Sequence, residues 1–405
     1  MPTFQTLDEL DLQGKIVLVR ADLNVPMKDG HVTDNTRLVR FLPTLVALQE
    51  KEAKIVILSH FGRPKGKRNE DFSLRPVVSV LNDLVGKPIA FAEDCVGEAA
   101  QKAVQKLQAG QILVLENTRF HPEEEANDPT FAKEIAALGD AFINDAFSAA
   151  HRAHATTASL ADLLPAAAGK LMQEELEALG NALEHPQKPL GAIIGGAKIS
   201  TKLDLLHNLI KKVDLLVLGG GMANTFLAAQ GFDVGKSLFE PEMVGTTKTI
   251  NSEAEALKCK ILLPKDVVIA SELKEGAETQ IVAVDAVPKD SMILDIGPQS
   301  IAETRMHLAP CCTIIWNGPL GVFETPPFDR GTNEIAQAVA DLTKESGALS
   351  VAGGGDTLAA LAHAGVAKEL SYISTAGGAF LEWLEGKTLP GIAALEKAAN
   401  RARTS

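Results

Sequence analysis

The sequence predicts an α/β protein with two doubly wound parallel-sheet domains that face a cleft and are joined by an interdomain helix. Three observations support this fold class. Short apolar runs alternate with helical stretches, and several are continuous, as expected for strands buried on both faces of a parallel sheet. The residues that follow these runs change in character near residue 190. The 405 residues are also enough for two ordinary domains and too many for one core.

The expected strands are short runs of mainly aliphatic residues. They lie at Ile16–Val19, Ile55–Leu58, Ile112–Leu115, Ala141–Ile143, Ala192–Ile194, Leu215–Leu218, Ile314–Trp316 and Leu349–Val351. Ligands of doubly wound sheets bind just beyond the carboxyl ends of the strands. The residues after each run are therefore the first candidates for a functional site.

Basic and polar side chains gather in the loops of the first half. The candidates are Asp22, Asn24, Arg37, His60, Arg63, Arg119 and Arg152. Eight of the twelve arginines lie at or before Arg152, and the guanidinium fork suits carboxylates and phosphates. A shared sheet edge would bring these groups together around a ligand with phosphate, carboxylate and hydroxyl groups. Chance and surface solubility are the alternative explanation of the arginine distribution. His151 and His154 favour a structural or anion-facing role over metal binding.

Glycines follow the strands of the second half, at Gly195-Gly196, Gly219–Gly221 and Gly353–Gly355. Glycine permits close backbone approach, and a loop between a strand and a helix aims free N–H groups at phosphates. Any one of these clusters could be a simple tight turn. Three of them in one half of the chain indicate a nucleotide site.

Four charged residues near these glycines are candidates for nucleotide and metal binding. Lys198 and Lys202 are expected on one face of a helix that begins at the glycine turn, or are simply solvated. Asp356 is expected to cap the following helix, to bind Mg²⁺, or to do both. Glu324 could accept hydrogen bonds from ribose hydroxyls or face water.

Several classes of protein are disfavoured. Neither GxxxxGK[ST] nor GxGxxG occurs. The net charge of −13 argues against nucleic acid or an anionic membrane as a partner. No secretory signal or membrane-spanning run is expected, and the four cysteines show no CxxC spacing, which favours the cytoplasm. No hydrolytic triad is evident, and transfer between an ionised carboxylate and a phosphate requires no general base.

A boundary between the two halves fits the segment Leu171–His185, an amphipathic helix that is closed by Pro186 and Pro189. A second helix is expected after Pro390-Gly391.

Nine segments together resemble phosphoglycerate kinase, in the order of that family and over the whole chain. They are RADLNVP (20–26), LSHFGRPKG (58–66), LENTRFHPEE (115–124), NDAFSAAHRAHA (144–155), GGAKISTK (195–202), GGGMANTF (219–226), WNGPLGVFE (316–324), GGGDT (353–357) and STAGGAFLEWLEGKTLPG (374–391). Ala376 departs from the family pattern, which usually has a third glycine there.

The resemblance implies two Rossmann-like domains and Mg²⁺-dependent transfer from ATP to 3-phosphoglycerate, giving ADP and 1,3-bisphosphoglycerate. It assigns glycerate binding to residues 1–170 with about 390–405, a hinge to 171–189, and nucleotide binding to 190–389. It also implies a monomer.

The site residues follow by position. Those that would hold the glycerate are Asp22, Leu23, Asn24, Arg37, His60, Phe61, Gly62, Arg63, Arg119 and Arg152. Those that would hold the nucleotide are Lys198, Lys202, Gly219, Gly220, Asn317, Glu324, Gly353, Gly354, Gly355, Asp356 and Thr357, with Asp356 as the metal ligand. The groups implied in catalysis are Arg37, Lys198, Gly354 and Gly378.

Closure about 171–189 and the Ser374–Gly378 loop is expected to align the substrates and expel water. Two other classes share parts of the pattern. A nicotinamide dehydrogenase would have the same sheet but needs the absent GxGxxG motif. A non-catalytic two-lobed binding protein would have a cleft but no need for a lysine pair at a glycine turn.

Overall fold

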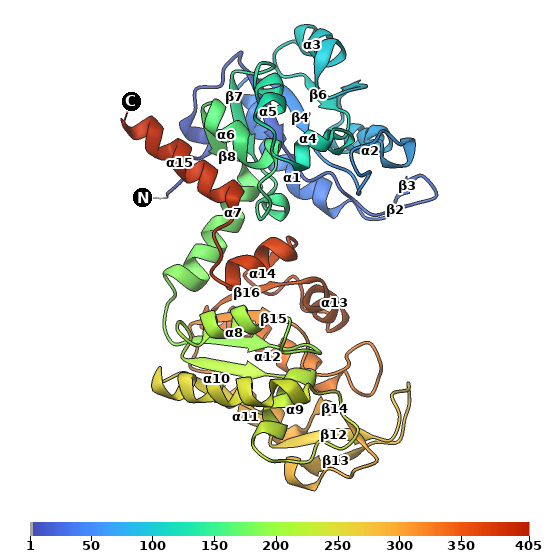
Figure 1. The fold of residues 1–405 in the computed structure, drawn as a ribbon, viewed down its shortest axis with the longest axis vertical. Coiled ribbons are helices and arrows are strands. Elements are labelled where there is room, and N and C mark those ends of the chain that lie inside the picture. The colour runs from blue at the N-terminus through green and yellow to red at the C-terminus, as the bar shows by residue number, and fades with distance from the viewer. Residues whose placement is uncertain (1–2, 405) are drawn as a thin grey trace. The chain divides into compact units, whose positions relative to one another are not determined.

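The computed structural model describes residues 3–404, which form two compact units (Figure 1). Unit 1 lies within Met1–Leu176 and Thr388–Ser405, and unit 2 is Glu177–Lys387. Each unit has its own sheet and core. Both main sheets are parallel, so the predicted α/β fold with two doubly wound sheets is confirmed.

The six-stranded sheet of unit 1 has the order β5-β6-β4-β1-β7-β8. Its strands are β1 (Ile16–Arg20), β4 (Lys54–Leu58), β5 (Ile89–Ala92), β6 (Ile112–Leu115), β7 (Ala141–Asn144) and β8 (Ala166–Ala168); β2 (Met27–Lys28) and β3 (His31–Val32) form a separate hairpin. Arg20 at the end of β1 is level with Leu58 of β4 and Asn144 of β7. The loops after these three strands therefore leave the sheet at the same edge.

Helices and short helical turns alternate with the strands of this sheet, and the last of those before unit 2, α7, crosses the boundary between the units (Figure 1). They are η1 (Leu7–Glu9), α1 (Thr36–Glu50), η2 (Glu70–Phe72), α2 (Arg75–Val85), α3 (Gly97–Gln105), η3 (Thr118–Phe120), α4 (Pro122–Glu125), α5 (Pro129–Ala136), η4 (Phe147–Ala149), η5 (Ala155–Ser159), α6 (Leu160–Leu163), α7 (Lys170–Leu179) and α15 (Pro390–Thr404). The C-terminal α15 packs against β8, α6 and η5, so the end of the chain is part of unit 1.

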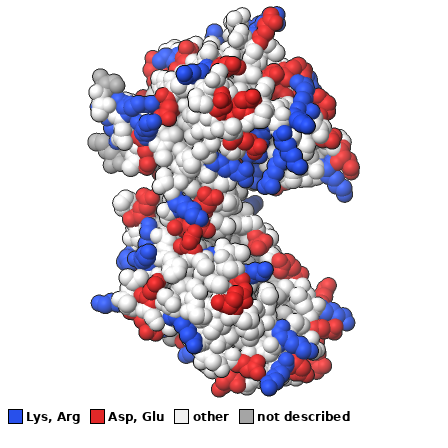
Figure 2. Space-filling view, viewed as in Figure 1, with Lys and Arg blue, Asp and Glu red and all other residues white. Residues whose placement is uncertain are grey.

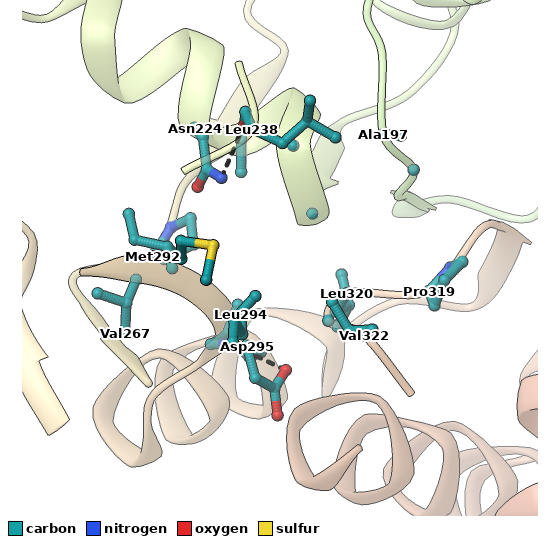
Figure 3. Close-up of a pocket in the computed structure, with 18 of the residues that line it drawn as sticks. Ala197, Asn224, Leu238, Val267, Met292, Leu294, Asp295, Pro319, Leu320 and Val322 are labelled. Atoms are coloured by element: carbon teal, nitrogen blue, oxygen red, sulfur yellow. Dashed lines mark hydrogen bonds between the residues drawn. The ribbon is translucent and has the colours of Figure 1, made fainter. Parts of the chain in front are cut away.

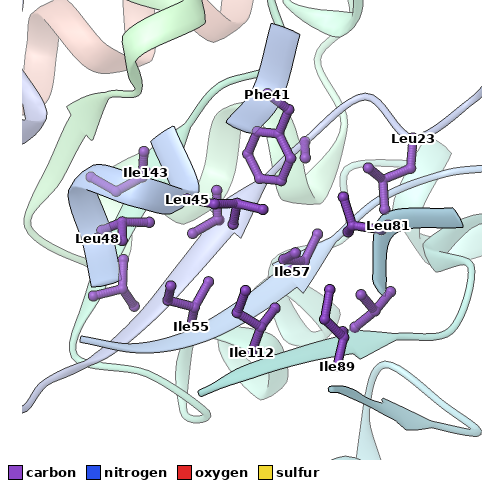
Figure 4. Close-up of a cluster of buried hydrophobic side chains, with 14 of the residues drawn as sticks. Leu23, Phe41, Leu45, Leu48, Ile55, Ile57, Leu81, Ile89, Ile112 and Ile143 are labelled. Carbon is purple, nitrogen blue, oxygen red and sulfur yellow. The ribbon is translucent and has the colours of Figure 1, made fainter. Parts of the chain in front are cut away.

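Local chemistry explains where these helices begin and end. Asp128 precedes α5, and its carboxylate accepts hydrogen bonds from the backbone N–H groups of Thr130 and Phe131. Helix α2 ends at Gly86, which adopts the left-handed conformation with φ of 68°. The core of unit 1 forms where the apolar faces of α1 and α2 meet the sheet. Figure 4 shows Phe41, Leu45 and Leu81 from these helices over the isoleucines of the strands.

Unit 2 contains a six-stranded parallel sheet with the order β11-β10-β9-β15-β16-β17. Its strands are β9 (Leu190–Ile194), β10 (Leu215–Leu218), β11 (Lys260–Leu262), β15 (Thr313–Asn317), β16 (Leu349–Gly353) and β17 (Tyr372–Ser374). A second sheet of three antiparallel strands, β13-β12-β14, consists of β12 (Asp266–Ala270), β13 (Gln280–Ala283) and β14 (Met292–Ile296). The sequence analysis did not predict this second sheet.

The helices of unit 2 alternate with these strands. They are η6 (Gly180–Glu184), α8 (Leu203–Leu209), α9 (Gly220–Ala229), η7 (Pro241–Met243), α10 (Val244–Ala256), η8 (Val284–Ala286), α11 (Pro298–Leu308), α12 (Arg330–Ser346), α13 (Gly355–His363) and α14 (Gly378–Leu384). The helix predicted over Leu171–His185 is present as α7, followed directly by the π-helical turn η6. The fully buried Trp316 of β15 lies in the main core of unit 2.

Candidate active site

An acidic and a basic side chain fix each other beside β1 in unit 1. The Asp22 carboxylate lies 2.9 Å from the Arg37 guanidinium and also accepts a hydrogen bond from the Ser148 hydroxyl. Arg37 Nη1 donates to the carbonyl oxygen of Asn24 at 2.7 Å. The predicted pair Asp22 and Arg37 is therefore brought together, although the two residues lie on different elements.

Amide side chains tie the loops that follow β1, β4 and β6. Asn24 Oδ1 accepts a hydrogen bond from the Gly62 N–H at 2.9 Å. Asn117 accepts from the Phe61 N–H at 3.1 Å and donates to the Phe61 carbonyl at 2.7 Å. Arg119 Nη1 donates to the Gly62 carbonyl at 3.0 Å. The sequence analysis missed Asn117, because a residue that shapes a loop carries no charge pattern of its own.

The remaining predicted residues of unit 1 differ in exposure. Leu23 is buried, and its N–H donates to the Ser59 hydroxyl at 3.0 Å. Arg63 is exposed and makes no hydrogen bond or ion pair among the described residues. Arg152 is half-buried, with Nε 3.1 Å from Nε2 of His151. Figure 2 shows basic side chains gathered on unit 1 near α1, with acidic side chains between them.

The electrostatics of this cluster favour an anion. Burial, followed by the charges of Arg20 and Arg119, holds the pKa of His60 well below its usual value. Burial and then Arg119, Arg20 and Arg152 lower the pKa of His154 to about 4. Burial lowers the pKa of Arg119 itself to about 10. These groups resist further positive charge, and a bound anion would relieve that cost.

In unit 2, side-chain hydrogen bonds join the ends of the adjacent strands β9, β15 and β16. Lys202 Nζ donates to the Gly195 carbonyl at 2.7 Å and to Asn317 Oδ1 at 2.6 Å. Asn317 Nδ2 donates in turn to the Gly353 carbonyl at 2.7 Å. The Thr357 hydroxyl accepts from the Gly318 N–H at 2.7 Å. Four predicted nucleotide-binding residues, Lys202, Asn317, Gly353 and Thr357, therefore belong to one network.

Gly354 can only be glycine in this network. Its φ is +99°, and an added Cβ would lie 2.6 Å from Nδ2 of Asn317. Gly354 precedes α13, and Gly219 precedes α9 in the same way. Both helices begin at the carboxyl edge of the main sheet. The free N–H groups of their first turns can therefore donate hydrogen bonds to a phosphate group.

Two sequence predictions on this side are wrong. Lys198 and Lys202 do not lie on one helix face, because α8 begins only at Leu203 and both lysines precede it. Lys198 is exposed, whereas burial lowers the pKa of Lys202 to about 8 against the opposing effect of Asp356. Asp356 does not cap α13 either. The cap position is Gly354, and Asp356 lies in the first turn without a capping bond.

A pocket of about 340 Å³ opens beside this network (Figure 3). Its lining is mostly apolar and includes Met292 and Leu294 of the antiparallel sheet and Leu320 and Val322 of the loop after β15. Of the predicted nucleotide residues, Gly220, Glu324 and Asp356 line the pocket. An apolar pocket with a few polar groups at its edge suits a heterocyclic base and its sugar.

The Asp356 carboxylate has the properties of a magnesium ligand. It is exposed, lines the pocket and makes no hydrogen bond or ion pair within residues 3–404. Mg²⁺ typically takes one or two carboxylates, with phosphate oxygens and water in its other positions. A single uncommitted carboxylate next to a helix N-terminus that suits phosphate fits this requirement.

The family model described as phosphoglycerate kinase matches residues 7–387. The chain belongs to the phosphoglycerate kinase family. It is 61% identical over 393 residues to the phosphoglycerate kinase of Ruegeria sp. (strain TM1040), with 97% of this chain and 99% of the relative covered. It is 59% identical over 392 residues to that of Rhodospirillum centenum, with 97% and 99% covered.

Solved structures agree. Phosphoglycerate kinase from Coxiella burnetii superposes with a TM-score of 0.92 at 46% identity, covering 98% of this chain and all of that one. The enzyme from Pyrococcus horikoshii OT3 gives 0.79 at 32% identity with the same coverage.

Family membership fixes the reaction. The chain is a kinase of glycolysis that transfers a phosphoryl group reversibly between ATP and the carboxyl group of 3-phosphoglycerate, with Mg²⁺. The predicted family, enzyme class and cofactor are confirmed. No helix within the described residues is long and apolar enough to cross a membrane.

Gly378, a predicted catalytic residue, is the first residue of α14. It follows Gly377, whose φ is +46°. Ala376, which replaces a usual family glycine, is buried and has a negative φ, so alanine causes no backbone strain there.

Three residues of types that bind metals, none of them a predicted site residue, come together in unit 1. One ligand atom each from Asp94, Cys95 and His121 falls within 4.8 Å of the others. His121 Nε2 is 2.7 Å from Asp94, and burial raises the pKa of the Cys95 thiol well above its usual value. The described cysteines are all free. This cluster ties the loop after β5 to the start of α4.

Asp295 at the base of the pocket was missed, because nothing in the sequence around β14 suggested a site. Its carboxylate accepts hydrogen bonds from the N–H groups of Gly331 and Ile296 at 2.6 and 2.8 Å. A Cβ on Gly321 would lie 2.2 Å from its Oδ1. Burial raises the pKa of Asp295 to about 7, against the opposing effect of these hydrogen bonds. The acid therefore packs against Gly321 in the loop that carries Leu320 and Val322, and it holds the first turn of α12 through Gly331.

We expect Asp295 to make the free energy of unfolding depend on pH. Because its folded pKa is raised from 3.8 to about 7, the folded state binds more protons between these values, and stability falls as pH rises through this window. Between pH 4.5 and 8 the loss relative to Asp295→Asn should be about 3 kcal/mol, the equivalent of the roughly 2.5 pKa units that this range covers. Denaturant unfolding of both proteins from pH 4.5 to 8 measures it. The exposed Asp290→Asn is the control, and parallel pH curves for wild type and Asp295→Asn would contradict the prediction.

Proposed function

We propose that the two units divide the substrates of the kinase between them. Residues 1–170 with about 390–405 bind 3-phosphoglycerate, and residues 190–389 bind ATP with its Mg²⁺. The segment 171–189 is the hinge. The observation that carries this assignment is the contrast in chemistry between the two strand edges. Unit 1 ends its strands in a basic cluster, and unit 2 ends them in glycines beside a pocket of about 340 Å³.

In unit 1, the basic groups bind the charged ends of 3-phosphoglycerate. Arg63, Arg119 and Arg152 supply guanidinium groups, which suit phosphate and carboxylate. Asp22 and Asn24 are acceptors for the hydroxyl group of the glycerate. Asp22 also holds Arg37 at 2.9 Å, so the position of this arginine is set before the substrate arrives.

In unit 2, the apolar pocket takes the adenine, and Glu324 at its edge accepts hydrogen bonds from the ribose. The phosphates lie over the N-termini of α9 and α13, next to Lys198 and the network of Lys202. Asp356 holds Mg²⁺, which when bound neutralises charge on the phosphates of the nucleotide. The first turn of α14 at Gly378 offers further N–H donors to the transferring group.

Transfer itself requires alignment and charge neutralisation. The accepting carboxylate is already ionised, so the described residues need supply no general base. Arg37 from the glycerate site and Lys198 from the nucleotide site are the two cations assigned to the transferring phosphoryl group. Donors that are fixed before the reaction stabilise its charge at little further cost.

A crossed pair of variants tests the division of substrates. Arg63→Ala should raise KM for 3-phosphoglycerate about tenfold or more and leave KM for ATP unchanged, because it removes one charged hydrogen bond. Val322→Trp should fill the pocket and do the reverse. Steady-state kinetics in the direction of ATP consumption, coupled to a dehydrogenase that removes the acyl phosphate, measures both. If both variants affected the same substrate, the assignment would be wrong.

We also propose that the enzyme is a monomer that closes when both substrates bind. Small-angle scattering should then show a smaller radius of gyration with 3-phosphoglycerate and a non-hydrolysable ATP analogue together than with either alone. The forward scattering of the same samples gives the mass of one chain or of several. Unchanged curves would argue against closure as a large motion.

The cytoplasm is the proposed compartment, which fractionation of the source cells would test.

A further inference from the structure

Arg20, the last residue of β1, is fully buried, unlike the exposed Arg63 and the half-buried Arg152. Each of its nitrogens has a partner. Nη1 donates to the carbonyl of Ala21, Nε donates to the Thr156 hydroxyl at 3.0 Å, and Nη2 lies 2.9 Å from Nδ1 of His60. Because the side chain is fully buried, Arg20 is not open to a ligand from solvent. Among these hydrogen-bond partners, His60 is the one that belongs to the proposed glycerate site.

The contact with His60 has a single chemical interpretation. A guanidinium group carries donors and no acceptor, so Nδ1 of His60 must accept the hydrogen bond. An imidazole that accepts through Nδ1 carries its proton on Nε2. Nε2 has no hydrogen-bond partner among the described residues. It is also not one of the atoms in this part of the chain that are both fully buried and without a partner, so it retains some exposure to solvent. His60 therefore presents an accessible Nε2–H group.

A buried acid holds Arg20 in this orientation. The Thr156 hydroxyl accepts from Arg20 and donates to the carboxylate of Glu124. The Thr156 N–H donates to the same carboxylate at 3.0 Å. Glu124 is fully buried and its charge opposes that of Arg20. This relay fixes the guanidinium group and compensates its charge away from solvent.

The groups that face His60 all disfavour a second proton on its ring. They are Arg20 from β1, Arg37 from α1, Arg119 from η3 and His154 at the start of η5, and each lowers the pKa of His60 together with burial, the largest effect. Protonation would also place an N–H of the imidazole against the N–H of Arg20. Geometry and charge thus agree on a neutral ring.

We propose that Arg20 is a positioning residue that holds His60 as the neutral Nε2–H tautomer, so that His60 binds the anionic substrate as a fixed hydrogen-bond donor. The proposal rests on the proposed function in one respect, that the glycerate lies at His60. It predicts that the contribution of His60 to KM for 3-phosphoglycerate is constant between pH 6 and 8, where an ordinary histidine titrates.

Nitrogen NMR of ¹⁵N-histidine-labelled wild-type enzyme tests the tautomer directly. The His60 signals are assigned by their loss in His60→Gln. We expect one neutral tautomer with the proton on Nε2 at every pH from 6 to 8. His121, whose pKa is raised mainly by its hydrogen bond with Asp94, is an internal control that titrates. A His60 ring that is protonated at pH 7, or carries its proton on Nδ1, would overturn the proposal.

Variants test whether Arg20 is the cause. Arg20→Met with Glu124→Gln removes the donor without leaving a buried charge uncompensated. We expect its His60 to exchange between tautomers and to titrate nearer its usual pKa, and KM for 3-phosphoglycerate to rise about tenfold and become pH-dependent. If this double variant does not fold, Thr156→Val weakens the same relay, and Thr156→Ser, which keeps the hydroxyl, is its control.

The outcomes separate the two proposals. An unchanged tautomer and pH profile in the folded variants would overturn the role of Arg20. Addition of 3-phosphoglycerate to the wild type should shift the Nε2 signal of His60. A fixed tautomer without this shift would leave the role of Arg20 intact and overturn the placement of the glycerate.

Discussion

Replacement of Lys198 with alanine should lower kcat about 10²–10³-fold, the usual effect of removing one charged donor from a developing charge. The structure supports this role in a specific way. Lys198 follows the glycine turn after β9 and is exposed, and its ammonium group makes no hydrogen bond or ion pair among the described residues. Lys202, by contrast, is committed to Gly195 and Asn317. Lys198 is therefore the lysine that can move with the phosphoryl group.

Steady-state kinetics with both substrates saturating measures this effect. Lys211→Ala removes another exposed lysine from unit 2 and should leave kcat unchanged. A change in KM for ATP with normal kcat would show that Lys198 contributes only to ground-state binding. Lys202→Ala should in addition lower the free energy of unfolding, measured by denaturant titration, because that change leaves Asn317 Oδ1 without its donor.

Replacement of Arg37 with alanine should lower kcat by a similar factor, about 10²–10³-fold. Its guanidinium group is held at 2.9 Å from Asp22 and 2.7 Å from the carbonyl of Asn24, so its position is set in the free protein. A cation fixed in this way stabilises the transition state without reorganisation. Arg37→Lys should recover part of the loss, since an ammonium group keeps the charge but not the planar fork.

A matched control for this prediction is Arg68→Ala. Arg68 is also on unit 1 and pairs with Glu70 and Glu93 at the surface, where such ion pairs contribute about 0–1 kcal/mol. It should leave both kcat and KM unchanged. An effect of Arg37→Ala that is confined to KM for 3-phosphoglycerate would assign Arg37 to substrate binding rather than to transfer.

The two wrong predictions have different causes. The four-residue spacing of Lys198 and Lys202 fits a helix face, but Lys202 Nζ reaches across to β15, and α8 begins only afterwards. Asp356 has the residue type of a helix cap, yet Gly354, two residues before it, occupies that position. The helix propensity of residues 198–202 carries no information about the hydrogen bond of Lys202 with a strand more than a hundred residues away.

The residues that the sequence analysis missed have structural roles rather than direct roles in binding. Asn117, Thr156 and Glu124 hold loops in place, and Asp295 supports the wall of a pocket from an antiparallel sheet that apolar runs did not predict. Each acts through buried hydrogen bonds with residues distant in the sequence. Their types and spacing carry no signal of this, because a buried polar group is defined by its partners.

The sequence by itself determined the fold class, the division into basic and glycine-rich strand ends, and the family, because apolar periodicity and short motifs are local properties. The tertiary structure decided which charged side chains are committed and which are available. Lys202 and Arg20 are bound within the protein, while Lys198 and Arg63 are exposed. The tautomer of His60 could likewise be inferred only from its contact with Arg20, because the position of the proton on the ring depends on the neighbouring group that the fold places there.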